Sequence, residues 1–323
     1  MCSSDLVPLV PYLLLAPDPA ELRDVPAVTS PPLRYPTGPA PPPLWTPGMS
    51  LGINPTNPAL AMPSPREEMR VYRIEYGRPV NYPIRLSVVP NEGPRRFQVV
   101  RNADTGTVHS TRNNRVTGLM DSRVIGSGTF VLVPNEVNFS DTRELPPEMQ
   151  SAIQFLAAQG VLHGFSRLEY RPMASLTRAQ AASIFSRLLS IEDVNAASGF
   201  SDVTSGDWFY NSVGSVRRAG IMAGHNADIF MPDGFLLKNQ LVVMVSRVLR
   251  TEMGYLPPVN TVEILDAMYS DWGRLPDWSI SDVALATREG LVVHRQDGSF
   301  APNAMLTRAE AAIMLYRLYW MLW

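Results

Sequence analysis

Cysteine, lysine and histidine are scarce in this chain, and each shortage excludes a class of site. The 323 residues include a single cysteine, Cys2, which excludes an intramolecular disulfide and a cysteine-rich metal site. The four histidines (His109, His163, His225 and His294) never recur at the i, i+4 spacing of a helical zinc motif. We therefore expect neither a metal nor a cofactor.

A charge excess of one sign and a long hydrophobic run are also missing. The net charge is −2, which gives no electrostatic reason to expect a nucleic acid or an anionic membrane as partner. Lys238 is the only lysine, so arginine supplies nearly all the positive charge, as codon bias in a GC-rich genome would produce. No apolar run approaches the ~20 residues of a membrane span. We expect no transmembrane segment.

Catalytic groups are missing in the same way. Cys2 has no plausible base, and no serine, histidine and aspartate can be placed in a nucleophilic arrangement. The Asp-Gly turns at residues 233–234 and 297–298 lack the carboxylate density of a calcium loop. We therefore expect no catalytic residue and no enzyme activity in this chain.

Proline dominates residues 1–65, because 17 of the 30 prolines lie between positions 8 and 65. Runs such as 41–43 favour extended polyproline geometry, so a spacer is expected; a ligand for an SH3-type domain is the alternative. The opening MCSSDL is what GTG TGC TCT TCC GAT CT encodes when GTG is read as the start codon, and this DNA resembles a sequencing-adapter end. We therefore expect residues 1–6 to be an artefact and the natural N-terminus to be missing.

Alternating apolar and polar residues appear in the next segment, 66–137. Four stretches show the pattern: 69–76, 84–89, 97–101 and 129–133. Turn residues separate them, among them Asn91-Glu92-Gly93-Pro94. A small antiparallel β-domain, with a partial β-sandwich as one form, is the prediction. The residues of this segment do not indicate a function.

Three copies of one pattern fill residues 138–323. The copies span 138–190, 199–251 and 268–323, and each opens with an aromatic residue, Ser and Asp. The landmarks at matching offsets are the aspartates Asp141, Asp202 and Asp271, the glycines Gly160, Gly220 and Gly290, and the basic residues Arg178, Lys238 and Arg308. Each copy predicts two helices, with the glycine as a left-handed cap of the first. About 50 residues can hardly bury two apolar stripes alone, so the copies should share one core.

The start of each second helix carries the features of a small anion site. Thr177 is a good N-cap, Gln180 lies at capping-box spacing, and Arg178 falls in the first turn. The third copy repeats this with Thr307, Arg308 and Glu310, and the middle copy keeps only Lys238 and Gln240. We count the three basic residues and the residues two positions after them (Gln180, Gln240 and Glu310) as candidate ligand contacts. A helix start offers unpaired N–H groups and a partial positive charge, and a guanidinium adds donors suited to a carboxylate. The alternative is a structural ion pair with Asp141, Asp202 or Asp271.

The set of landmarks resembles the S-layer homology family, over residues 138–323. The resemblance rests on the Phe-Ser-Asp openings, on Asp-Trp at 207–208 and 277–278, on Gly-Val-Leu-His-Gly at 160–164, and on Thr-Arg-Ala-Gln/Glu. The family implies an all-α, pseudo-threefold helical domain, which makes the whole chain α+β. It also implies binding of a cell-wall-linked polysaccharide, often one with pyruvate ketals, through the arginine of the Thr-Arg-Ala-Glu motif.

The resemblance adds Trp208, Trp278, Gly164 and Gly224 as candidate ligand contacts, since an aromatic ring can stack on a sugar and a glycine lets a sugar approach the backbone. The tryptophans could equally belong to the core. His294 replaces the glycine in the third copy, and Leu-Pro-Pro at 145–147 replaces Asp-Trp in the first. One or two working sites are therefore expected, not three.

The functional prediction is a non-catalytic anchor on the bacterial surface, bound to an acidic secondary cell-wall polysaccharide. Extracellular, cell-wall location follows from the same resemblance. Two alternatives stay open: the anchor of an exported enzyme whose catalytic module is missing from this chain, and an intracellular helical-repeat scaffold for protein partners.

Overall fold

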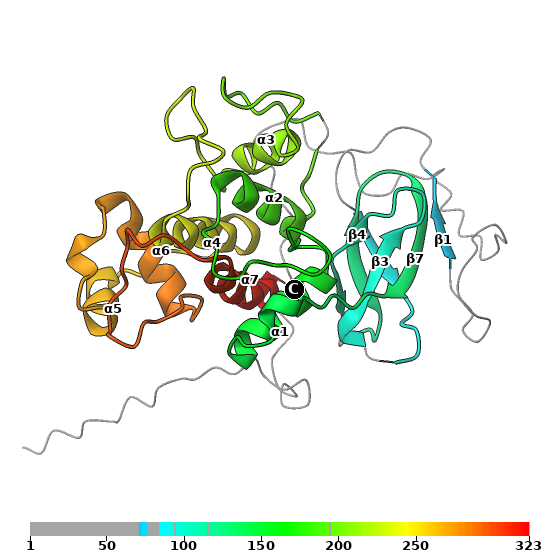
Figure 1. Cartoon of the computed structure of the whole chain (residues 1–323), viewed down its shortest axis with the longest axis horizontal. Helices are drawn as coiled ribbons and strands as arrows, with labels where there is room; N and C mark the ends of the chain where they lie inside the picture. The colour runs from blue at the N-terminus through cyan, green and yellow to red at the C-terminus, as the bar shows by residue number, and fades with distance from the viewer. Residues whose placement is uncertain (1–70, 76–83, 94, 115, 194, 323) are drawn as a thin grey trace, which may run out of the picture.

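The computed structural model describes residues 71–75, 84–93, 95–114, 116–193 and 195–322. Over these ranges the β-strands come first and the α-helices follow, so the chain is α+β with a small antiparallel part ahead of a helical part (Figure 1). The predictions for residues 1–65, including the artefact at 1–6, lie outside the described residues.

The strands form two antiparallel sheets. The first sheet has the order β1-β7-β3-β4 and the second has the order β2-β6-β5. The strands are β1 (Val71–Ile74), β2 (Ile84–Val88), β3 (Gln98–Asn102), β4 (Val108–His109), β5 (Thr111–Asn113), β6 (Met120–Val124) and β7 (Gly128–Pro134).

One hydrophobic cluster joins the inner faces of the two sheets. It includes Val100 and Phe130 of the first sheet together with Met120 and Val124 of the second. The four predicted strands overlap β1, β2, β3 and β7. The sequence did not predict β6, because its central residue, the buried Ser122, breaks the apolar alternation between Met120 and Val124.

Each of the three copies contributes a pair of helices to the helical part. The pairs are α1 (Pro147–Ala158) with α2 (Arg178–Leu189), α3 (Tyr210–Arg218) with α4 (Lys238–Met253), and α6 (Asp277–Arg288) with α7 (Arg308–Leu322). A further helix, α5 (Thr261–Met268), lies between the second and third pairs in the sequence, and short 3-10 turns occur at Arg95–Phe97, Ser140–Thr142 and Trp272–Arg274. One hydrophobic cluster runs through all three pairs, from Phe139 to Tyr319.

The end of each first helix is held by the second helix of the same copy. Gly160, Gly220 and Gly290 close the first helices with φ of 71°, 70° and 70°, the left-handed conformation predicted for them. Just beyond each glycine a backbone carbonyl accepts a hydrogen bond from an arginine on the second helix. The pairs are Arg187 Nη1 with Val161 O at 3.2 Å, Arg247 Nη1 with Ile221 O at 3.2 Å, and Arg317 Nη1 with Val292 O at 3.1 Å.

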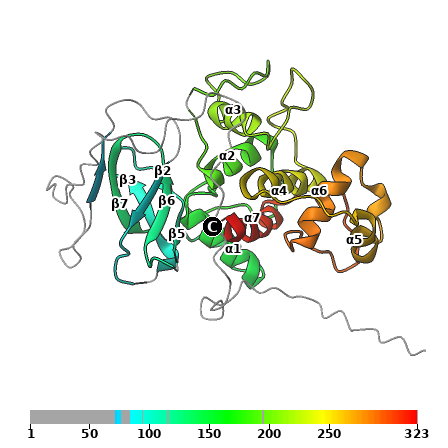
Figure 2. The ribbon, with the colours of Figure 1, turned by 180° about the vertical axis from the view of Figure 1, so that it is seen from behind.

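The β part is attached to the C-terminal ends of helices. The side chain of Gln159, at the end of α1, accepts from Thr111 N at 2.7 Å and donates to Arg96 O at 3.2 Å. Tyr319 in the last turns of α7 donates to Thr111 O at 3.1 Å. The view from behind shows β5 next to α1 and the C-terminus (Figure 2). The N-terminal starts of α2, α4 and α7 therefore face away from these attachment points.

Candidate functional site

The segments that precede α2, α4 and α7 meet in a closed ring of backbone hydrogen bonds. Leu176 N donates to Leu306 O at 3.0 Å, Leu306 N to Leu236 O at 3.1 Å, and Leu236 N to Leu176 O at 2.8 Å. Isolated antiparallel β-bridges join the neighbouring residues, for example Ser175 with Thr307. The ring brings the starts of the three helices, and hence their basic residues, to one end of the helical part.

The first N–H groups of these helices are not available to a ligand. Arg178 N donates to Gly234 O at 2.9 Å, and Ala179 N donates to Pro232 O at 2.9 Å. The other two starts repeat the arrangement: Lys238 N to Ala304 O, Asn239 N to Pro302 O, Arg308 N to Ala174 O and Ala309 N to Pro172 O. The expectation of unpaired N–H groups at these starts is therefore wrong, because each copy supplies carbonyl groups to the helix start of another copy.

The capping residues behave as the spacing predicts. Thr177 N donates to Gln180 Oε1 at 3.2 Å, and Gln180 N donates to Thr177 Oγ1 at 3.3 Å. Thr307 and Glu310 form the same pair, at 3.0 and 3.2 Å. In the middle copy Gln240 still accepts from Leu237 N at 3.2 Å, but leucine has no oxygen to return the bond. The side chains of Gln180, Gln240 and Glu310 thus hold the helix starts together.

Arg178 reaches from the first copy into the turn of the second copy. Its Nε donates to Phe230 O at 2.7 Å and its Nη2 donates to Ala223 O at 2.8 Å. The guanidinium carbon lies 4.8 Å from the centroid of the Phe230 ring, within cation–π range. Arg178 stays half-buried. We call this arrangement the first cation site.

The basic side chains of the second and third copies bind the turns of the third and first copies in the same way. At the second cation site, Lys238 Nζ donates to Val293 O at 2.9 Å. At the third, Arg308 donates through Nε to Tyr170 O at 2.9 Å and through Nη2 to His163 O at 2.7 Å. Lys238 and Arg308 are each only 5% exposed, so the first site presents its cation most openly.

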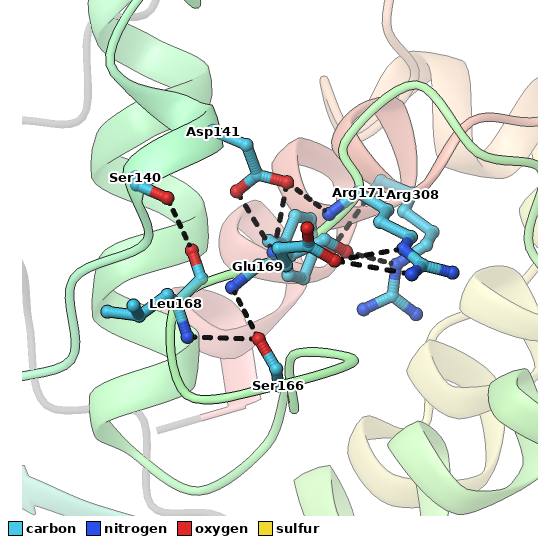
Figure 3. A network of polar contacts seen from close by, with 8 residues as sticks. Ser140, Asp141, Ser166, Leu168, Glu169, Arg171 and Arg308 are labelled. Atoms are coloured by element: carbon cyan, nitrogen blue, oxygen red, sulfur yellow. Dashed lines mark hydrogen bonds and ion pairs between the residues drawn. The ribbon is translucent and has the colours of Figure 1, made fainter.

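The three opening aspartates organise the turns instead of forming ion pairs with the cations. Asp141 accepts from the backbone N–H groups of Tyr170, at 3.0 and 3.1 Å, and of Arg171, at 2.7 Å (Figure 3). Asp202 binds the N–H groups of Phe230 and Met231 in this way, and Asp271 binds those of Phe300 and Ala301. Among the described residues no salt bridge joins these aspartates to the three cations, so the structural ion-pair alternative is not observed.

The second residue bound by each aspartate has an uncommon backbone conformation. Arg171, Met231 and Ala301 have φ of 57°, 59° and 55°, in the left-handed region that non-glycine residues rarely adopt. The carboxylate that accepts their N–H groups stabilises these turns. Each turn then presents a carbonyl group to a cation from another copy. These carbonyls belong to Tyr170 (bound by Arg308), Phe230 (bound by Arg178) and Val293 (bound by Lys238).

Burial controls the acidity of the cations. Desolvation lowers the pKa of Arg178 and of Arg308, and the negative charges of Asp202 (for Arg178) and of Asp141 (for Arg308) oppose that shift. Desolvation also lowers the pKa of Lys238 to about 8, against the opposing charge of Glu310. The two arginines therefore stay charged at any ordinary pH, whereas Lys238 loses its proton in mild alkali.

The glycines predicted to admit a sugar have a packing role. A Cβ at Gly164 would lie 2.5 Å from Phe139 Cε1, and a Cβ at Gly224 would lie 2.4 Å from Phe200 Cε1. The opening aromatic of each copy therefore occupies the space next to the glycine. In the third copy the matching ring is Tyr269, and His294 stacks on it with centroids 5.6 Å apart.

The two candidate tryptophans lie on the surface. Trp208 is 65% exposed and Trp278 is 56% exposed, so the alternative that they belong to the core is wrong. In the first copy Glu148 stands at the matching position and forms a 2.9 Å ion pair with Arg317. Two copies therefore present an exposed aromatic ring, and the first copy presents a charged pair.

Two pockets adjoin the first and second cation sites. The first pocket, of about 280 Å³, is lined by Phe200, Arg217, Gly220, Met222, Ala223, Gly224, Asn226 and Ala227. The second pocket, of about 580 Å³, is lined by Arg274, Arg295, Asp271, Asp297 and six small polar or apolar residues. Sequence reasoning did not single out Arg217, Arg274 or Arg295, because none of them recurs in all three copies.

Two kinds of feature are absent from the described residues. They contain no group of three or more histidine, cysteine, aspartate or glutamate side chains that could hold a metal ion. Nor does any helix among them have the length and apolar character needed to cross a membrane.

Comparison with known proteins matches the S-layer homology domain to residues 138–182 and 269–312, which lie in the first and third copies. Similar proteins include an amylopullulanase from Thermoanaerobacterium thermosulfurigenes, 30% identical over 169 residues that make up 52% of this chain and 9% of that protein. Exoglucanase XynX from Acetivibrio thermocellus is 26% identical over 58% of this chain and 17% of its own length. The surface-layer 125 kDa protein of Lysinibacillus sphaericus is 24% identical over 59% of this chain and 16% of its own length.

The matched stretches thus cover less than a fifth of each of these relatives. The middle copy, residues 199–251, repeats the contacts of the two matched copies, with Lys238 in place of arginine. By sequence, this chain therefore matches the S-layer homology domain at residues 138–182 and 269–312.

Proposed function

We propose that the chain is a cell-surface anchor that binds an acidic polysaccharide of the bacterial cell wall, such as a pyruvate-bearing secondary polymer. The named relatives include a surface-layer protein and two polysaccharide-degrading enzymes, proteins of different activity that share this stretch of sequence. A common module among such different proteins favours attachment over catalysis. The location that follows is the outer surface of the cell wall.

The observation that carries the proposal is the first cation site. Arg178 is half-buried between two carbonyl groups and an aromatic ring, so it is fixed in place while part of its guanidinium still meets solvent. A pre-positioned guanidinium suits a planar carboxylate, because little side-chain entropy is lost on binding. Trp208, exposed just ahead of α3 in the second copy, is a further ring on which a sugar can stack.

The three copies are proposed to sit around a pseudo-threefold axis. The ring formed by Leu176, Leu236 and Leu306 supports this arrangement, as do the three matching sets of helix-start bonds. In this proposal residues 138–323 form one domain, with copies at 138–190, 199–251 and 268–323, and residues 66–137 form a separate β-domain. Gln180, Gln240 and Glu310 shape the sites without contacting the sugar, because their side chains are bound to the helix starts.

Replacing Arg178 with glutamine tests the proposed site. Binding of the full chain to polymer-bearing sacculi should weaken by roughly tenfold, since one charge-assisted hydrogen bond to the carboxylate is lost. Arg143→Gln removes the same charge from an exposed position on the first copy and serves as the control. Equal binding by the two variants in a sedimentation assay would show that Arg178 does not contact the ligand.

What the anchor holds is a second question with two candidate answers. The surface-layer relative favours a structural surface protein, and the amylopullulanase and exoglucanase relatives favour an attached enzyme. Recovering the gene sequence upstream of codon 1 distinguishes them, because an enzyme module ahead of the proline-rich segment would identify the second.

A further inference from the structure

We propose that Arg217 is a second ligand-binding cation beside Arg178, and that the first pocket takes a stretch of polymer carrying two acidic groups. This inference rests on the proposed function. It identifies the first cation site as the main binding site and names a second residue that binds the ligand there.

The two arginines stack on one pair of aromatic rings. The Phe200 and Phe230 rings are tilted against each other with centroids 5.4 Å apart. The guanidinium carbon of Arg178 lies 4.8 Å from the Phe230 centroid, and that of Arg217 lies 4.5 Å from the Phe200 centroid. The ring pair therefore holds two positive charges close enough for a short piece of polymer to meet both.

Arg217 is positioned by its own contacts. Its Nη1 donates to Ser198 O at 2.8 Å, and the side chain is otherwise exposed. The guanidinium passes directly over Gly199, where a Cβ would lie only 1.9 Å from Nη1 and where φ is 69°. Any residue with a side chain at position 199 would displace the guanidinium of Arg217. Glycine at this position therefore allows Arg217 to reach the pocket.

The first pocket has the electrostatic character that an acidic ligand requires. Its lining contains Arg217 but no aspartate or glutamate, and Ala223, whose carbonyl holds Arg178, forms part of its wall. The second pocket has two arginines, but Asp271 and Asp297 stand beside them. Carboxylates repel an anion at close range, so an acidic ligand should favour the first pocket.

The second charge occurs in one copy alone. The positions that match Arg217 are Ala157 in the first copy, which is 5% exposed, and Thr287 in the third copy. The hydroxyl of Thr287 is bound to Tyr269 Oη at 3.1 Å. Neither residue can supply a cation, so the three sites are unequal even though their helix starts are built alike.

The test compares Arg217→Gln with Arg218→Gln in the full chain. Arg218 is the adjacent exposed arginine on the same helix and pairs with Asp193 at 2.7 Å, outside the first pocket. Affinity for sacculi that retain their secondary polymer, measured at several salt concentrations, should fall roughly tenfold for Arg217→Gln and stay within about twofold for Arg218→Gln. The remaining affinity of Arg217→Gln should also depend less on salt than that of the unchanged chain.

Arg217→Lys tests the charge apart from the guanidinium, and it should retain more affinity than Arg217→Gln. If the unchanged chain binds sacculi but Arg217→Gln and Arg218→Gln bind equally well, the role of Arg217 is overturned while the proposed function stands. If the unchanged chain does not bind polymer-bearing sacculi at all, the proposed function falls, and this inference falls with it.

Discussion

At the scale of the residue, the three cations differ in how they can respond to pH. Arg178 and Arg308 keep their charge, whereas desolvation brings the pKa of Lys238 down to about 8. The ammonium group donates to a single carbonyl, Val293 O, and the residue is 5% exposed. Burial disfavours the charged form of a lysine, and one hydrogen bond does not offset the lost hydration. The protonated form of Lys238 therefore lowers the free energy of unfolding.

The lowered pKa of Lys238 predicts that the stability of the fold depends on pH. Between pH 8 and the ordinary lysine value of 10.5, the unfolded chain keeps the Lys238 proton and the folded chain has lost it, so the free energy of unfolding rises with pH. Relative to Lys238→Met, the unchanged chain should gain about 2 kcal/mol over this range in denaturant titrations. A stability difference that stays constant from pH 8 to pH 10.5 would show that Lys238 titrates normally.

The sequence identified these cations, but not where their side chains go. The helix-start spacing placed Arg178, Lys238 and Arg308 in equivalent positions, and the structure keeps them equivalent. The partners escaped prediction because they are far away in the chain: Arg308 and His163, for example, are separated by 145 residues. A carbonyl group is also present on every residue, so nothing in the sequence marks the one that accepts a bond.

At the scale of the element, the turn that follows each first helix is the recurring unit of the site. Its aspartate, its left-handed residue and its cation from another copy form one connected network, shown for the first copy in Figure 3. In the second copy Gly224 completes the turn, because the Phe200 ring and the carbonyl of Asn226 leave no room for a side chain.

Gly224→Ala should therefore disturb the first pocket by packing alone. Its Cβ would lie 2.4 Å from Phe200 Cε1 and 2.4 Å from Asn226 O, and overpacking of this kind costs about 1–3 kcal/mol. Gly206→Ala is the control, because a Cβ there meets nothing within 4 Å. Thermal unfolding should show a clear loss for the first variant and almost none for the second; equal melting temperatures would contradict the packing role.

Elements were predictable where their pattern was long and regular. The helices follow from apolar stripes and capping residues, and α2 begins at Arg178, one residue after the predicted cap Thr177. The short strands β4 and β5 could not be predicted, because two or three residues are too few to show an alternation of apolar and polar residues. The sequence pointed to Gly164 and Gly224, but their spacing alone could not distinguish a contact with a sugar from a contact with Phe139 or Phe200.

At the scale of the whole molecule, the cation sites and the β part lie at opposite ends of the helices. Helix α7 begins at Arg308 in the third site and reaches the β part through Tyr319. At 1.5 Å per residue, these two positions are roughly 16 Å apart along the helix axis. The β part therefore contacts α7 at the end opposite to its start, and Figures 1 and 2 show the β part on one side of the helical part.

The general architecture followed from repetition, which sequence shows directly. The contact between the β part and the helices did not, because it depends on single polar side chains such as Gln159 and Asn135, the latter donating to Ala158 O at 2.5 Å. Such side chains have no periodicity, and their partners are far apart in the chain.

We propose that the chain attaches to the wall through an acidic polymer and not through peptidoglycan itself. The most direct measurement is sedimentation of the full chain with sacculi, before and after chemical removal of the secondary polymer. We expect the chain to pellet with intact sacculi and to stay in the supernatant with stripped ones. Equal pelleting with both preparations would contradict it, because the cation sites would then have no acidic ligand to explain the attachment.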